Sequence, residues 1–457
     1  MSTPDANPAR GSNVSRYFLR EEHQYAPFIG SAIFSALFVG FPLGLLLAHE
    51  AAQGSGLGGR FPQLVQVHGH TQLFGWLGLF VMGMGYRLVP RFTAVKLRHQ
   101  WWVPLTLACA VVGLALRAIG QTFADEGTVF AVLFGSSGAL EFLGVSLFVA
   151  VIIRALLLGR PDEFGYKPFF AAGVVWLAVA MLLNAYLAFV AAGESNPILP
   201  SDRSDVVAFL LLYGFAAMFV LAVSIRTFPT FFGRERANRT LVTIAWAGLN
   251  AGIALYATSD WWGSYEQPDG LRYTENAGFL LVGAGLILMV ATLGIFKGSP
   301  HRLRESARRN MRFVRSAYAW LALAAVLQVC FAASALADSR FVADFQTDAV
   351  RHFIAIGFLT TVIIGMAFLV MPALAMRRLG GRSANLIATV LLTFLHGAAA
   401  SRGLGSLIVN EGHINEGYWT MTVGGTLAVL AMAIFAGYML WSPKEPPADE
   451  ITLTERV

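Results

Sequence analysis

Long apolar stretches recur along the whole of this 457-residue chain. A helix needs about 20 consecutive apolar residues to cross the hydrocarbon core of a bilayer. Only 13% of the residues are charged, against about 25% in an ordinary soluble domain. The pattern predicts an all-α integral membrane protein with twelve transmembrane helices. The predicted spans are residues 27–49, 65–90, 101–122, 129–158, 168–194, 204–232, 240–258, 275–296, 314–336, 348–376, 383–406 and 416–441.

Polar tails at residues 1–26 and 442–457 flank this transmembrane domain of residues 27–441. Lys and Arg residues gather in the loops that follow the even-numbered spans, and few occur in the other loops. Because cytoplasmic loops are enriched in Lys and Arg, both tails are predicted to be cytoplasmic. The basic residues therefore indicate membrane orientation, and no nucleic acid is expected as a partner.

Three spans share one spacing of residues. In each, a glycine follows the first position by five residues and a proline follows the glycine by fifteen. The three sets are His70, Gly75 and Pro90; Phe209, Gly214 and Pro229; and His352, Gly357 and Pro372. Because the copies lie four spans apart, we predict three pseudo-repeats of four helices, each with one inner helix.

Two of these first positions are histidines, His70 and His352, and both lie about five residues inside their spans. Two imidazoles at one depth can hold a single haem as axial ligands. The alternative is that each is a buried polar residue bonded to a neighbour. His68 points about 200° away from His70 at about 100° per residue. The repeat register selects His70 to face His352, and leaves His68 as a supporting group or a ligand of another metal.

Five further polar groups stand out in or near the spans. Arg351 and Arg402 lie at the level of the histidine pair, where they would bind haem propionates or lipid headgroups. Glu141 lies well inside the fourth span, where a carboxylate indicates a proton path or a pairing, and Arg117 is a candidate partner. His396, within the eleventh span, is either a second haem or metal ligand or a hydrogen-bonded residue of the bundle.

The stretch HTQLFGWLGLFVMGMGYRLVP is similar to the second helix of the catalytic subunit of haem–copper oxidases and nitric oxide reductases. A closer resemblance is to the NnrS family, membrane proteins linked to nitric oxide stress, in HGHTQLFGWLG, RTFPTFFG and RHFIAIGFLTTVIIGM. The resemblance implies an oxidase-like bundle in the bacterial cytoplasmic (inner) membrane. It also implies one low-spin haem b, at His70 and His352, that transfers electrons or binds nitric oxide.

The chain departs from the oxidase pattern where a second haem and its neighbouring metal would bind. The position two residues before His352 is Val350 rather than histidine, and the sixth and seventh predicted spans contain no histidine. Copper therefore lacks identifiable ligands, and enzymatic activity stays open. The alternatives are a respiratory oxidase or nitric oxide reductase-like subunit, a transporter, and a haem-free membrane scaffold. The expected partners are the bilayer, a small gas such as nitric oxide, and an electron donor that the sequence does not identify.

Overall fold

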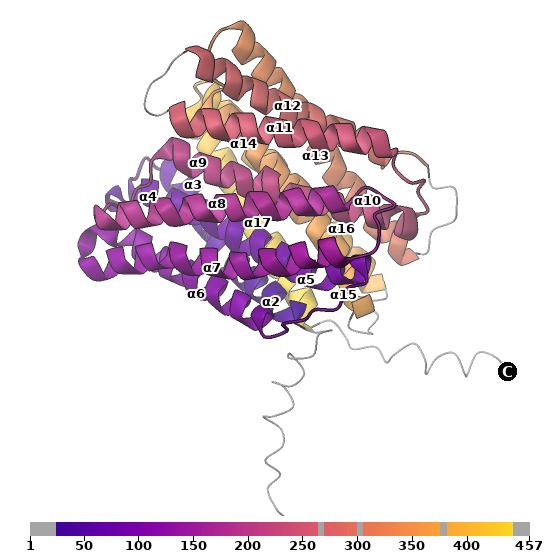
Figure 1. The fold of residues 1–457 in the computed structure, drawn as a ribbon. Coiled ribbons are helices and arrows are strands. Elements are labelled where there is room, and N and C mark those ends of the chain that lie inside the picture. The colour runs from indigo at the N-terminus through magenta and orange to yellow at the C-terminus, as the bar shows by residue number, and fades with distance from the viewer. Residues whose placement is uncertain (1–23, 264–268, 299–304, 375–381, 442–457) are drawn as a thin grey trace, which may run out of the picture.

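The computed structural model describes residues 24–263, 269–298, 305–374 and 382–441 (Figure 1), so the predicted tails lie outside it except for residues 24–26. Within these ranges, twelve helices are long and apolar enough to cross a membrane, and most of their ends agree with the predicted spans to within a few residues. The twelve are Tyr25–Ala52, Phe61–Thr93, Trp102–Thr122, Thr128–Leu158, Lys167–Gly193, Ser201–Phe232, Arg239–Trp262, Gly270–Leu293, Ala307–Ala337, Asp344–Phe368, Ala384–Asn410 and Ile414–Met439.

Four of these spans are not α-helical throughout, because they contain a π-helical segment. The first span consists of α2 (Tyr25–Ser35), η1 (Ala36–Gly40) and α3 (Phe41–Ala52). The second is α4 (Phe61–His70), η3 (Thr71–Gly78) and α5 (Leu79–Thr93). The sixth is α9 (Ser201–Phe209), η5 (Leu210–Ala217) and α10 (Met218–Phe232), and the tenth is α14 (Asp344–His352), η6 (Phe353–Thr360) and α15 (Thr361–Leu374). The other spans are α6 (Trp102–Thr122), α7 (Thr128–Leu158), α8 (Lys167–Gly193), α11 (Arg239–Gly263), α12 (Asp269–Leu293), α13 (Glu305–Ala337), α16 (Arg382–Asn410) and α17 (Ile414–Trp441).

The second, sixth and tenth spans share one design. In each, an eight-residue π segment begins directly after the first position of the predicted spacing, His70, Phe209 or His352. They are also the most buried spans, with 89%, 83% and 78% of their apolar window buried, whereas the others reach at most 56%. These three spans are therefore the inner helices of the bundle.

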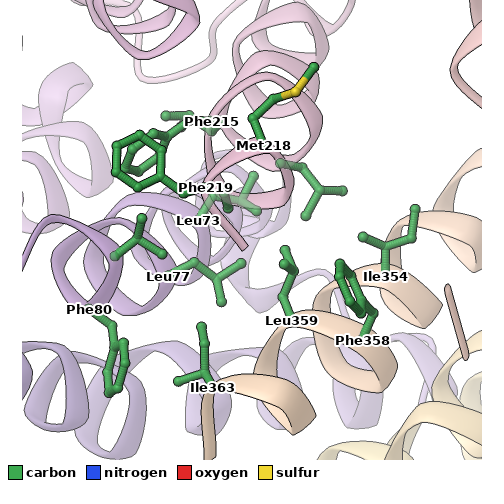
Figure 2. Close-up of a cluster of buried hydrophobic side chains, with 14 of the residues drawn as sticks. Leu73, Leu77, Phe80, Phe215, Met218, Phe219, Ile354, Phe358, Leu359 and Ile363 are labelled. Atoms are coloured by element: carbon green, nitrogen blue, oxygen red, sulfur yellow. The ribbon is translucent and has the colours of Figure 1, made fainter. Parts of the chain in front are cut away.

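The inner helices meet along an apolar seam (Figure 2), to which each contributes large side chains. Leu73 and Leu77 come from η3, Phe215 from η5, and Phe358 and Leu359 from η6. A polar contact also crosses the seam, where Trp76 Nε1 donates to Thr360 Oγ1 at 3.0 Å. Because this core is continuous, the inner helices hold fixed positions relative to one another.

The outer helices form three arcs around this core. Three pairs that follow one another in sequence pack side by side, α6 with α7, α11 with α12, and α16 with α17. A third helix extends each arc, through contacts of α7 with α8, α12 with α13, and α17 with α3. The last contact joins the C-terminal end of the bundle to its first span, so the first and last spans are neighbours.

The glycine of the predicted spacing makes room for a tryptophan in two inner spans. A Cβ on Gly214 would lie 2.6 Å from Cβ of Trp176, and a Cβ on Gly357 would lie 2.8 Å from Cβ of Trp320. Each indole then donates to the span that follows the inner helix. These bonds join Trp176 Nε1 to Asn250 Oδ1 (2.8 Å) and Trp320 Nε1 to His396 Nδ1 (2.7 Å).

Candidate functional site

Two histidines from different inner helices line one cavity of about 170 Å³, which we call the histidine cavity. They are His68, near the end of α4, and His352, the last residue of α14. Further lining comes from α3, η3, η6, α16 and α17. The cavity therefore lies where the first two spans meet the tenth, eleventh and twelfth.

Both imidazoles are fixed through the same ring nitrogen. His68 Nδ1 lies 2.9 Å from the carbonyl oxygen of Gly40, and His352 Nδ1 lies 2.8 Å from the carbonyl oxygen of Asp348. Because a carbonyl oxygen only accepts, each Nδ1 carries the proton and donates it. Each Nε2 then has a free lone pair, and no hydrogen bond to either Nε2 occurs in the described part of the chain. Histidines that bind metals are commonly held in this way.

A glycine of α3 allows the His68 ring to take this position. A Cβ on Gly44 would lie 2.4 Å from Cε1 of His68, far inside van der Waals contact. Other small residues also line the cavity, at Gly69, Ala208, Ala355, Gly425 and Ala428. Small residues therefore line the cavity at several points around the two imidazoles.

Charged residues lie beside His352. Asp348, one helical turn before it, has Oδ1 at 3.2 Å from His352 Nδ1 and accepts from Ser406 Oγ at 2.5 Å. Asp348 also forms an ion pair with Arg402 at 3.1 Å. Arg351 pairs at 3.3 Å with Asp205 of α9. Both arginines line the cavity, and each is already paired with a carboxylate, so an anionic group of a bound molecule would share them with Asp348 and Asp205.

His70 lies on the other side of α4, in a second cavity of about 1,020 Å³, which we call the large cavity. Its other walls come from α6, α8, α9 and the segment between α8 and α9. Five residues line both cavities, namely Val65, Gly69, Leu73, Ala208 and Arg351. The two cavities are thus neighbours, and their shared lining comes from the second, sixth and tenth spans.

A buried polar network begins at His70. Its Nε2 lies 3.0 Å from both carboxylate oxygens of Glu141, which is fully buried in α7. Asn184 Nδ2 donates to the same carboxylate at 3.0 Å. Asn184 Oδ1 in turn accepts from Arg117 Nη1 at 2.6 Å. Of the two interpretations of Glu141, the structure displays a pairing, and Arg117 reaches the carboxylate through Asn184 rather than directly.

The structure and the sequence prediction place different histidines beside His352. The register argument selects His70, but His68 is the residue that shares a cavity with His352. His70 turns toward α7, just as Phe209, in the matching position of the sixth span, stacks on Tyr256 of α11 with ring centroids 4.0 Å apart. Residues at the same position of different inner spans each face the outer helices next to their own span, so these residues do not face one another. His68 is two residues off that register and points the other way.

The remaining predicted candidate, His396, accepts the indole proton of Trp320 through Nδ1. It does not line either cavity, so its place fits the hydrogen-bonded alternative. Among the described residues, no group of three or more His, Cys, Asp and Glu side chains is placed to hold a metal ion. The sequence analysis missed Asp348, Asp205 and Asn184, although Asp348 has a recognisable signal because an acid four residues before a histidine lies on the same helix face.

The donor set of the histidine cavity fits the iron of a haem, which takes imidazole nitrogens as axial ligands. Its volume is below the roughly 300–1,000 Å³ of typical small-molecule sites. A haem therefore fits only when lining side chains move aside.

Comparison with known protein families finds a match to part of the chain. A family model described as a domain of unknown function (DUF8744) matches residues 231–444. This range runs from the end of α10 to the end of α17, so it includes His352 and Arg402 but neither His68 nor His70. None of the curated proteins matches the chain.

Proposed function

We propose that this multi-pass membrane protein binds one haem b in the histidine cavity, with His68 and His352 as the axial ligands. The observation that supports this most is the shared anchoring of the two rings. Each Nδ1 donates to a carbonyl oxygen, so each Nε2 keeps the lone pair that iron requires. The proposal takes over His352 from the sequence prediction and replaces His70 by His68.

The neighbouring residues have supporting parts in this proposal. Arg351 and Arg402 line the cavity and would hold the two propionates, since arginine binds carboxylates through paired hydrogen bonds. The hydrogen bond from Nδ1 to a carbonyl oxygen fixes the tautomer and increases the basicity of the ligand nitrogen. Asp348 has the same effect on His352 through its carboxylate.

We also propose that the bundle consists of three pseudo-repeats arranged like the catalytic subunit of haem–copper oxidases. Three features support this, namely the matching π segments of the inner spans, the three arcs of outer helices, and the paired glycine–tryptophan contacts. The loop charges support an orientation with both termini in the cytoplasm, in the inner membrane of a bacterium. In this orientation both cavities lie toward the outer face.

The process we propose is tolerance of nitric oxide or nitrosative stress, from the resemblance to the NnrS family. A haem with two histidine ligands accepts and releases one electron at a time. It binds nitric oxide only when one histidine leaves the iron.

The experiment that tests the proposal is an optical and electron paramagnetic resonance spectrum of the full-length protein in detergent, prepared with haem supply assured. We expect a low-spin spectrum in the wild type that is lost in His68→Ala and in His352→Ala. The matched control is His70→Gln, which keeps a donor for Glu141 and should keep the spectrum. A colourless wild type would overturn the proposal. Loss in His70→Gln with retention in His68→Ala would restore the original ligand assignment.

A further inference from the structure

The large cavity has two features that together indicate a specific kind of ligand. Its buried end is polar, with His70, Arg117 and Asn184 in its lining, and aliphatic side chains such as Leu73 and Leu187 line it beside them. The remaining lining includes four charged side chains, Glu194, Arg203, Asp205 and Arg351. Its volume of about 1,020 Å³ lies at the upper end of the range of small-molecule sites, roughly 300–1,000 Å³. The buried end therefore offers polar partners beside an apolar surface.

The buried end offers both a hydrogen-bond acceptor and donors. His70 donates through Nε2 to Glu141, so its Nδ1 has a lone pair, and no partner of this atom occurs among the described residues. Arg117 is only 3% exposed, and its one hydrogen bond to a described residue leaves from Nη1. Its Nε lacks a partner there. A buried arginine with unused donors is costly, and this favours a ligand that accepts from it.

The charges of the buried end favour a neutral ligand. Arg117 and Glu141 are joined through Asn184, so one positive and one negative side chain balance each other. An ionic ligand would lose its hydration on entering the buried end, and it would find no unpaired charge there to compensate for that loss. A neutral hydroxyl group, by contrast, donates to His70 Nδ1 and accepts from Arg117.

The wall of the large cavity reaches the lipid-facing side of α8. Tyr186 and Val190 line the cavity, and they are 51% and 39% exposed. They continue a stripe of exposed apolar side chains along the same helix that includes Val175 and Leu182. Because this stripe faces the hydrocarbon of the bilayer, a ligand dissolved in the membrane has a route into the cavity.

We propose that the large cavity binds a membrane-soluble hydroquinone, with one ring hydroxyl between His70 and Arg117 and the apolar part along α8. A hydroquinone combines a neutral hydroxyl, which suits His70 and Arg117, with the lipid solubility that entry from the bilayer requires. The assignment of this ligand as an electron donor rests on the proposed function, because it requires a haem in the neighbouring histidine cavity. The binding itself does not.

The position of the cavity suits such a donor. Val65, Gly69 and Leu73 of the second span line both cavities, together with Ala208 of α9 and Arg351 of α14, so the proposed ligand and the proposed haem would be neighbours. Transfer of one electron from the hydroquinone to the one ferric haem breaks one O–H bond, releases one proton to solvent and leaves a semiquinone. Two such semiquinones disproportionate to one quinone and one hydroquinone, so complete oxidation of one hydroquinone reduces two ferric haems, one in each of two protein molecules.

The test measures binding of a hydroquinone with a ten-carbon chain to the full-length protein in detergent, by equilibrium dialysis under reducing conditions. Two variants address the site, Ala191→Phe, which adds a bulky side chain to the cavity lining, and Arg117→Leu, which removes the donors. We expect at least tenfold weaker binding in each. The matched control is Leu182→Phe, which lies on the exposed stripe of α8 outside the cavity and should bind as the wild type does. If Arg117→Leu does not fold, Ala191→Phe decides.

The same measurement on His352→Ala separates this inference from the proposed function. Retained binding in that variant, or in a colourless wild type, would uphold the hydroquinone site whatever the fate of the haem. Absence of binding to the wild type would overturn the inference, as would equal binding to Ala191→Phe and the wild type. A tightly bound phospholipid that is present in the wild type, lost in Ala191→Phe and not displaced by the hydroquinone would also overturn it.

Discussion

The substitution Gly44→Ala provides the sharpest test of how His68 is held. The added methyl group would lie 2.4 Å from Cε1 of His68 and 3.0 Å from its Nδ1. Carbon atoms in contact are normally about 3.5–4.0 Å apart, so the ring has to retreat by roughly 1 Å. The Nδ1 hydrogen bond to Gly40, now 2.9 Å long, then exceeds the usual range of about 2.7–3.2 Å for such bonds.

We expect two consequences of this displacement. Overpacking of a tight site costs about 1–3 kcal/mol, so the apparent melting temperature of the protein should fall. The Nε2 atom moves with the ring, so haem occupancy should drop at least tenfold, or the low-spin spectrum should become a mixture with a five-coordinate form. Both are measured on one sample, by thermal unfolding and by an optical titration with haem.

The matched control is Gly30→Ala in α2, the same transmembrane span. No atom lies within 4 Å of a Cβ built on Gly30, and alanine is the better helix former by roughly 1 kcal/mol. This variant should keep the spectrum and should melt at or above the wild-type temperature. A Gly44→Ala protein with the wild-type spectrum and melting temperature would refute the reasoning, because His68 would then not depend on the space above Gly44.

Three further predictions concern the polar network and the helix contacts. Glu141→Leu leaves two buried partners of the carboxylate unsatisfied and should lower the free energy of unfolding by about 3–5 kcal/mol, measured by chemical denaturation in mixed micelles. Glu141→Gln keeps hydrogen-bonding atoms in place and should cost less than half of that. Equal losses in the two variants would contradict this prediction. Trp320→Phe removes the 2.7 Å bond to His396 and should cost about 1 kcal/mol without changing the haem spectrum, whereas a changed spectrum would show that His396 belongs to the haem site. Gly278→Ala should reduce thermal stability because its methyl group would lie 2.5 Å from the backbone nitrogen of Tyr256, while Gly248→Ala, which has open space, should be neutral.

The number and approximate position of the spans are readable from the sequence because hydropathy reports directly on the bilayer. The glycine–proline spacing also identifies the inner helices before any contact is known. The structure adds the reason that such a spacing exists, since each π segment starts directly after its first position, as at His70 and Phe209, and the glycine lies inside the segment. A π turn has no simple residue signature, so the sequence marks its place without revealing its geometry.

The sequence does not determine which neighbouring helix each side chain faces. Periodicity correctly indicates that His68 and His70 point in opposite directions, but it does not say which helix lies on each side. That depends on neighbours distant in sequence, such as Glu141 for His70 and Gly40 for His68. Asn184 illustrates the same limit, because a single amide in an apolar span gains its meaning only from the carboxylate and the guanidinium that it joins.

The two-residue separation of His68 and His70 explains how one helix serves two cavities with different chemistry. Residues two apart on a helix point about 200° apart, so α4 presents an imidazole with a free Nε2 to one cavity and an imidazole bonded to a carboxylate to the other. Gly69 lies between them and lines both cavities, which keeps the wall as thin as a helix allows. A change at position 69 should therefore alter both cavities at once, whereas changes at 68 and 70 should act separately. That separation is the property that a donor site and an acceptor site require if electrons are to pass between them while their ligands stay apart.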